Sequence, residues 1–202
     1  MFYTILIVWF LGALALSLLL NKVSEKIKYP YGWKGKLVVV IGTIGTWFLI
    51  YNKYGVGNLS NLDILVFAFI VAILWAIIVI DYKYYEIPNE YNLALFLLGL
   101  VYTVNNYDRA LAIILAGAGI FFFYYVVRAI TKGNLGGGDV RLAGSLGLFF
   151  SSFHLAMEFV SVTFIFGAII SLALLLFRVK TTGDKIAFGP YISLAFMYVV
   201  LG

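Results

Sequence analysis

The sequence predicts an all-α protein, a polytopic bundle of about eight transmembrane helices. First, 64% of its 202 residues are apolar and only 11% are charged, whereas ordinary soluble domains are about half apolar and a quarter charged. Second, the mean hydropathy is +1.05. Third, the apolar residues occur in runs of about 15 to 23 residues, separated by short charged loops, as in helices that cross a bilayer. These observations exclude an ordinary soluble domain.

Eight spans are expected in chain order, because about 20 apolar residues cross a hydrocarbon core of about 30 Å. We predict them at residues 2–20, 36–51, 62–80, 91–104, 109–130, 140–151, 155–177 and 187–201. The second, fourth and sixth are short, so each is a tilted, a re-entrant or a partly buried helix. The first has no basic segment before it and its apolar run continues past Ala13-Leu14-Ala15. We therefore predict a retained helix rather than a cleaved signal peptide.

The basic residues predict the orientation of these spans in a cell membrane. If the spans alternate, the loops after the first, third, fifth and seventh lie on one side. They hold 12 of the 14 Lys and Arg residues, namely Lys22, Lys26, Lys28, Lys34, Lys36, Lys83, Arg128, Lys132, Arg141, Arg178, Lys180 and Lys185. The positive-inside rule makes that side cytoplasmic and puts both termini outside. The net charge of +5 is therefore explained by topology, and we expect no nucleic-acid partner.

The residue types restrict the possible chemistry. The chain has no cysteine and a single histidine, His154, which excludes disulfides, thiolate zinc sites and His-rich metal sites. We expect no metal and no cofactor. Carboxylates remain the strongest candidates, and three of the nine, Asp63, Asp108 and Glu158, fall at the outer ends of spans, where a solvated charge costs little.

Two cytoplasmic aspartates differ from the other acidic residues in position. Asp81 directly follows the unbroken apolar run 62–80, and Asp139 follows three consecutive glycines and opens the next apolar run. Glycines expose the backbone and allow positive φ, so a second chain could bind along that peptide edge. The simpler alternatives are an N-cap for Asp139 and a solvated helix-end charge for Asp81. Pro88 is well suited to start the next helix.

Three cytoplasmic segments together resemble a known family. DYKYYEIPN at 81–89, NLGGGDVRLAGSLGLF at 134–149 and IAFGPYISLA at 186–195 are similar, in this order, to the peptidase domain of type IV prepilin peptidases and archaeal preflagellin (archaellin) peptidases. These are membrane aspartyl proteases with a G-x-G-D motif. The resemblance covers about residues 62–202, which implies a six-helix peptidase core preceded by a two-helix extension with a basic cytoplasmic loop, residues 1–61.

The resemblance implies roles for individual residues. The family's two catalytic aspartates correspond to Asp81 and Asp139, and Gly136 and Gly138 supply the glycines of the motif. The stretch Gly136-Gly137-Gly138 would hold the substrate as an extended strand. For Gly189-Pro190 two interpretations stay open: a wall of the substrate groove, or a helix start with proline in its first turn. Glu86 either contacts a basic leader or is a solvated loop carboxylate.

The activity implied is endoproteolysis at the cytoplasmic membrane face. The enzyme would remove the short basic leader from prepilin, pseudopilin or archaellin precursors, just before their hydrophobic helix, by two-aspartate activation of water. Many bacterial members carry a cysteine-rich insertion and also N-methylate the new amino terminus. This chain has no cysteine, so we predict cleavage only. The alternatives are a small ion- or proton-coupled transporter with intramembrane carboxylates, a non-catalytic scaffold, or a presenilin-like protease.

Overall fold

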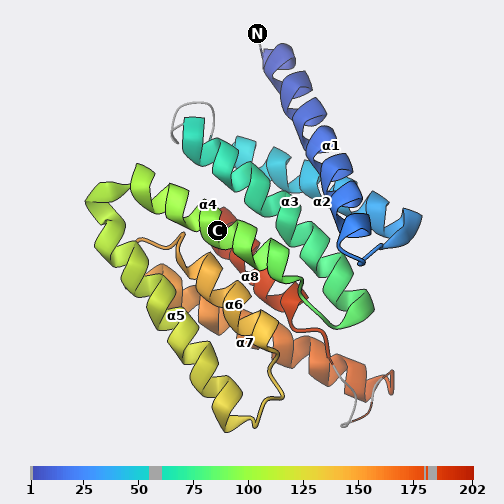
Figure 1. Cartoon of the computed structure of the whole chain (residues 1–202), viewed down its shortest axis with the longest axis vertical. Helices are drawn as coiled ribbons and strands as arrows, with labels where there is room; N and C mark the ends of the chain where they lie inside the picture. Colours follow the sequence, from blue (N-terminus) through green and yellow to red (C-terminus); the bar gives the residue numbers. More distant parts are fainter. Residues whose placement is uncertain (1, 55–60, 180, 182–185) are drawn as a thin grey trace.

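The computed structural model describes residues 2–54, 61–179, 181 and 186–202, and within these ranges it is helical with no β-strand. The all-α prediction is therefore confirmed. The helices are α1 (Phe2–Lys26), α2 (Gly32–Tyr54), α3 (Asn61–Tyr84), α4 (Asn89–Asn105), α5 (Ala110–Ile130), α6 (Gly137–Gly147), α7 (Phe153–Leu176) and α8 (Gly189–Leu201), with a 3₁₀ turn at Tyr107–Arg109 before α5 (Figure 1).

Four described segments are long and apolar enough to cross a membrane. They are Gly32–Ile50, Leu65–Tyr84, Tyr107–Ile130 and Phe153–Leu176. The second span, predicted at residues 36–51, is shorter than the helix that the structure has. Helix α2 has 23 residues and includes Lys34 and Lys36 in its first turns. The apolar criterion left Lys34 outside the predicted span, although a helix end at the membrane surface accommodates a lysine. The apolar helices fit a membrane protein in a lipid bilayer.

The sixth predicted span is a short buried helix. Residues 140–151 were expected to form it, but α6 has only 11 residues, about 16 Å in length, and cannot cross a 30 Å core by itself. Its residues from Leu142 to Gly147 are all buried, and α6 packs against α4, α5 and α8. Of the three alternatives for this segment, the structure therefore has the partly buried helix.

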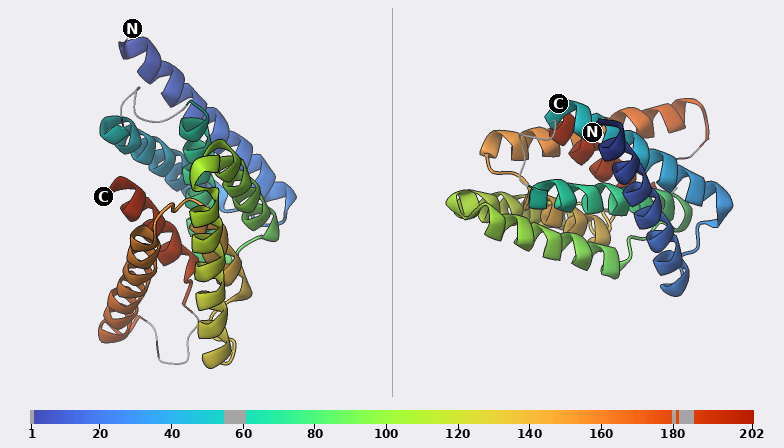
Figure 2. Two further views of the ribbon diagram at one scale, coloured as in Figure 1. Left: turned by 90° about the vertical axis from the view of Figure 1, so that its left-hand side faces the viewer. Right: turned by 90° about the horizontal axis from the view of Figure 1, so that it is seen from above.

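Helix α3 is the central element of the bundle. It packs against α1, α2, α4 and α8 (Figure 1), and Ile70, Leu74, Ile77 and Ile80 are completely buried. A helix that is hydrophobic on all sides belongs in a core, which explains why its sequence has no polar face. Figure 2 shows α1 leaning away from the other helices toward the N-terminus, while one face of its C-terminal half is buried, at Ser17, Leu20, Asn21 and Ser24.

Successive helices run in opposite directions, so the C-terminal end of one helix and the N-terminal end of the next lie at the same end of the bundle. The C-terminal ends of α3 and α5 lie at the same end of the bundle as the N-terminal ends of α4, α6 and α8 (Figure 1). The segment between α1 and α2 is attached to this end, because Lys83 Nζ and the Tyr84 hydroxyl donate to the Pro30 carbonyl at 2.8 and 2.6 Å. Lys180 and Lys185, counted in the charge argument, lie outside the described residues.

Candidate active site

Asp81 lies in the last turn of α3 and is buried, with 4% of its surface exposed. The helix ends three residues later, where Tyr85 adopts a left-handed conformation with φ of 56°, a frequent way to stop a helix. The Oδ2 atom of Asp81 accepts a 2.8 Å hydrogen bond from the backbone N–H of Gly189. Asp81 is therefore a held, buried carboxyl group rather than the solvated helix-end charge of the simpler alternative.

Gly189 is the first residue of α8, and its lack of a side chain allows the contact with Asp81. A Cβ atom at this position would lie 2.8 Å from Asp81 Oδ2 and 3.1 Å from Ile87 Cδ1. Pro190 follows in the first turn of α8, where its fixed φ and missing N–H cost nothing. Gly189 thus contacts a candidate catalytic residue directly, while Pro190 starts the helix.

Asp139 is the third residue of α6, with 8% of its surface exposed. Gly136 is the N-cap, so the N-cap alternative for Asp139 is wrong. Instead its Oδ2 atom accepts a 3.1 Å hydrogen bond from the Gly136 N–H, a favourable arrangement for a carboxylate in the first turn of a helix. The Oδ1 atom is buried and has no hydrogen-bond partner within the described part of the chain, an unmet hydrogen bond of the kind that is rare outside functional sites.

The three glycines before Asp139 allow close packing rather than an unusual backbone. Of the described glycines, only Gly32 and Gly133 have positive φ, so the positive φ that glycine allows is not used at 136–138. A Cβ on Gly137 would collide with the Arg128 guanidinium, and one on Gly138 would lie 3.1 Å from Ile87 Cβ. The loop therefore fits between the end of α5 and the segment that follows α3.

Both aspartates line one cavity of about 560 Å³. Its wall also contains Ile27, Tyr29, Tyr85, Glu86, Ile87, Pro88, Asn89, Glu90, Gly136, Gly137 and Gly138. The structure thus brings together the two predicted catalytic residues, the three motif glycines and Glu86. Gly189 and Pro190 do not line this cavity, although Gly189 contacts Asp81, which does.

The electrostatics of the cavity favour a proton on Asp139. Burial, followed by the nearby charge of Asp81, raises the pKa of Asp139 to about 7, against the smaller opposing effects of the Gly136 N–H and Arg128. Two carboxylates in one poorly solvated site resist double ionisation. At neutral pH a fraction of the protein molecules therefore carries a single proton on the pair of aspartates, which is the state that two-carboxylate catalysis needs.

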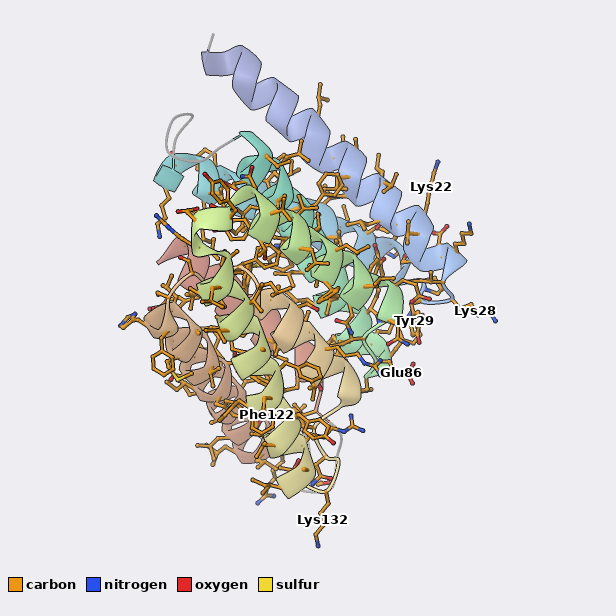
Figure 3. The ribbon with its side chains drawn as sticks, turned by 60° about the vertical axis from the view of Figure 1, so that its left-hand side comes forward. Lys22, Lys28, Tyr29, Glu86, Phe122 and Lys132 are labelled. Atoms are coloured by element: carbon orange, nitrogen blue, oxygen red, sulfur yellow. The ribbon has the colours of Figure 1, made fainter. Side chains whose placement is uncertain are left out.

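Tyr29 is a cavity residue that sequence reasoning missed. Its hydroxyl donates a 2.7 Å hydrogen bond to Glu86 Oε2, and Figure 3 shows the two side chains beside each other near the start of α4. An aromatic residue near a span end is typical of an interfacial belt. The sequence therefore offered no signal that Tyr29 belongs to the site.

The described residues contain no group of three or more His, Cys, Asp or Glu side chains that could hold a metal ion. What the arrangement can do is acid–base chemistry by two carboxyl groups that face one cavity. The cavity lies at the bundle end where α4 and α6 begin, since Pro88, Asn89, Gly136 and Gly137 line it.

Comparison with known proteins places the chain in a family. The model of the type IV leader peptidase family matches residues 68–176, more than half of the chain, and this region contains both Asp81 and Asp139. No curated protein and no solved structure matches significantly. The match contains the first two of the three similar segments, 81–89 and 134–149, and the chain belongs to the type IV leader peptidase family.

Proposed function

We propose that the protein is a membrane-embedded aspartic endopeptidase that removes the short basic leader from prepilin, pseudopilin or archaellin precursors. Family membership supports a leader peptidase. The observation that carries the aspartic mechanism is the cavity that Asp81 and Asp139 share, with both residues buried and Oδ1 of Asp139 without a partner among the described residues. The transporter, scaffold and presenilin-like alternatives have no comparable support.

The two carboxyl groups take different roles in this proposal. Asp81, which the Gly189 N–H holds in place, is the base in this proposal, because Asp139 is the carboxyl group on which the cavity favours a proton. It takes a proton from a water molecule, whose oxygen attacks the scissile carbonyl carbon. Asp139, whose pKa is raised to about 7, is the protonated partner and donates to the carbonyl oxygen. The carbon–nitrogen bond then breaks: the leaving amine takes up the proton that Asp81 received, and the oxygen that Asp139 protonated returns its proton to Asp139 as the carbonyl group re-forms.

The cavity wall supports recognition of a basic, extended leader. Glu86 and Glu90 both line the cavity and are exposed, so positive leader side chains find complementary charge there. Gly136, Gly137 and Gly138 line the cavity without side chains of their own, and such a wall suits an extended strand. An extended conformation also exposes the scissile bond, which a helix would shield.

We place the reaction at the cytoplasmic face, with both chain termini outside. The basis is the charge distribution of the sequence: both aspartates lie at the helix ends that carry most of the Lys and Arg residues, and the positive-inside rule makes that side cytoplasmic. The division into residues 1–61 and 62–202 remains part of the proposal. In it, the two-helix extension contributes Tyr29 to the cavity and is tied to α3 through Pro30.

The experiment is a cleavage assay with detergent-solubilised protein. The substrate is a precursor with a basic leader before a hydrophobic helix, and mass spectrometry follows the product in the presence of S-adenosylmethionine. We expect a product shortened by the leader, with an unmodified amino terminus. Absence of any shortened product across prepilin, pseudopilin and archaellin precursors would overturn the proposal, and a methylated product would overturn the cleavage-only part.

A further inference from the structure

A second cavity, of about 980 Å³, runs along the outside of α4, α5 and α6. Each helix contributes residues three or four positions apart, which form a single stripe on its surface. The rims are apolar side chains that are exposed in the described part of the chain: Leu93, Phe96, Leu100, Ile114, Phe121 and Phe122. In Figure 3, α6 lies between α4 and α5, and Phe122 lies on the exposed side of α5.

The floor of this groove is made of small residues. Gly117, Ala118, Gly144 and Ser145 line it. Gly117 and Gly144 let α5 and α6 pack closely, because a Cβ on them would lie 2.7 Å from Leu148 Cδ2 or 2.8 Å from Phe121 Cβ. The small, exposed Ala118 leaves room for an approaching helix. On α4 the lining runs from Asn89 to Leu100, which corresponds to about 16 Å of helix axis. The groove therefore has the length of about three helical turns.

The groove is continuous with the candidate active site at one end. Asn89 lines both cavities, and the Asn92 side chain, also in the groove, donates a 3.3 Å hydrogen bond to the carbonyl of Gly138 next to Asp139. The apolar rim side chains begin within one turn of these two amides. A chain that leaves the aspartates along this path therefore passes directly from a polar cavity onto an apolar surface.

The charges at the junction separate the two parts of such a chain. Arg141 lines the groove near this end, where its guanidinium donates to Asn89 Oδ1, whereas Glu86 and Glu90 lie on the side of the active-site cavity. A basic segment is repelled by the arginine and attracted by the glutamates. An apolar helix is instead expected in the groove, because the groove offers it a matching apolar surface.

We infer that this groove binds the hydrophobic helix of the precursor whose leader occupies the active-site cavity. The inference rests on the proposed function and extends it, because it adds a second contact that recognises the segment after the cut. The helix would lie with its first turns against the groove, so that the residues before it reach Asp81 and Asp139 in extended form. Membrane depth of the substrate helix and position of the cut are then coupled.

Disulfide crosslinking tests the location of the substrate helix. The native chain has no cysteine, so Leu100→Cys and Ile114→Cys in the groove each provide a single thiol, and Ile165→Cys and Leu172→Cys on the exposed face of α7 serve as matched controls. All four are made with Asp139→Asn, which keeps the precursor uncut, and the precursor carries one cysteine in its hydrophobic helix. We expect crosslinks from the groove at several times the control yield. Equal yields would overturn the inference.

Filling the groove gives a second, functional test. Ala118→Trp places an indole on the groove floor, and Ala112→Trp makes the same change on α5 at an exposed position outside the groove. For the full precursor we expect kcat/KM to fall about tenfold or more with Ala118→Trp and to stay near the wild-type value with Ala112→Trp. A short peptide that ends soon after the cut should be cleaved equally by all three proteins.

The outcomes separate the inference from the proposed function. If the wild type cleaves the precursor and Ala118→Trp cleaves it equally well, the groove holds something else, such as a phospholipid chain, and the inference is wrong while the peptidase stands. If the wild type cleaves no precursor, the proposed function fails, whereas selective groove crosslinks would still identify a helix-binding surface. Equal losses on precursor and short peptide would assign Ala118→Trp to damage of the active site and overturn the helix contact.

Discussion

The backbone N–H of Gly189 donates a 2.8 Å hydrogen bond to Oδ2 of Asp81, which lies 108 residues earlier in the chain. This bond joins the end of the central helix α3 to the start of the last helix, α8. It fixes the position of the Asp81 carboxyl group. The base of the proposed mechanism therefore depends on a glycine that lies outside the active-site cavity.

Gly189→Ala should reduce cleavage strongly. The added Cβ would lie 2.8 Å from Asp81 Oδ2, so either α8 or the carboxyl group must shift, and small displacements of a catalytic group are costly. We expect kcat/KM to fall about tenfold or more. The matched control is Gly119→Ala on α5, where a Cβ meets nothing within 4 Å; it should keep full activity and equal or higher thermal stability. Wild-type activity of Gly189→Ala would show that the contact is unimportant.

The pH dependence of kcat/KM should be a bell. Activity requires one proton on the pair, so it fails at low pH when both carboxyls are protonated and at high pH when both are ionised. Because the pKa of Asp139 is raised to about 7, the decline should begin near neutral pH, well above the ordinary range of an aspartate. A flat plateau from about pH 5 to 10, with the enzyme folded throughout, would contradict a shared proton.

Arg128→Gln should move the upper limb of that profile to higher pH. The Arg128 charge lowers the pKa of Asp139, so its removal raises this pKa and lets Asp139 keep its proton longer. Lys132→Gln, an exposed residue four positions later, removes the same charge as a control. The measurement is the full pH profile of both variants on one precursor. A shift to lower pH with Arg128→Gln would reverse the assigned sign.

Glu86→Gln and Glu90→Gln together should weaken the preference for basic leaders. Both carboxylates line the cavity, and their neutralisation removes the complementary charge while the amides keep the side-chain shape. We expect KM to rise several-fold for a precursor with a basic leader and to change little for one with a neutral leader, with kcat nearly constant. Equal effects on the two precursors would assign both residues to structure or solvation.

Single cysteines test the orientation of the bundle in the membrane. Lys22→Cys and Asn134→Cys are exposed on the side predicted to be cytoplasmic, and Tyr107→Cys and His154→Cys on the opposite side. In sealed cells an impermeant maleimide should label only the second pair, and the first pair should react after the cells are opened. Labelling of Asn134→Cys from outside would refute the assigned cytoplasmic face.

The helices and the two aspartates were predictable because their signals are local. Apolar runs identified all eight helices, and Asp81 and Asp139 stand out by their position after an apolar run and after three glycines. The short, buried character of α6 was not predictable with certainty, since apolar composition does not distinguish a bilayer from a protein core. Tyr29 and the contact between Gly189 and Asp81 depend on packing between distant segments, which no local pattern encodes.

The most direct test of the paired-carboxylate mechanism is the cleavage rate of Asp81→Asn and Asp139→Asn, measured on one precursor beside Asp108→Asn. Asp108 is exposed and lies in the turn before α5, outside the cavity, so its variant controls for the loss of one negative charge. We predict that each of the first two variants accumulates normally but loses at least about a hundredfold in kcat/KM, as expected for removal of an acid–base group, while Asp108→Asn cleaves like the wild type. Retention of more than about a tenth of wild-type activity by either variant, against that expected loss, would contradict the catalytic role proposed for the residue.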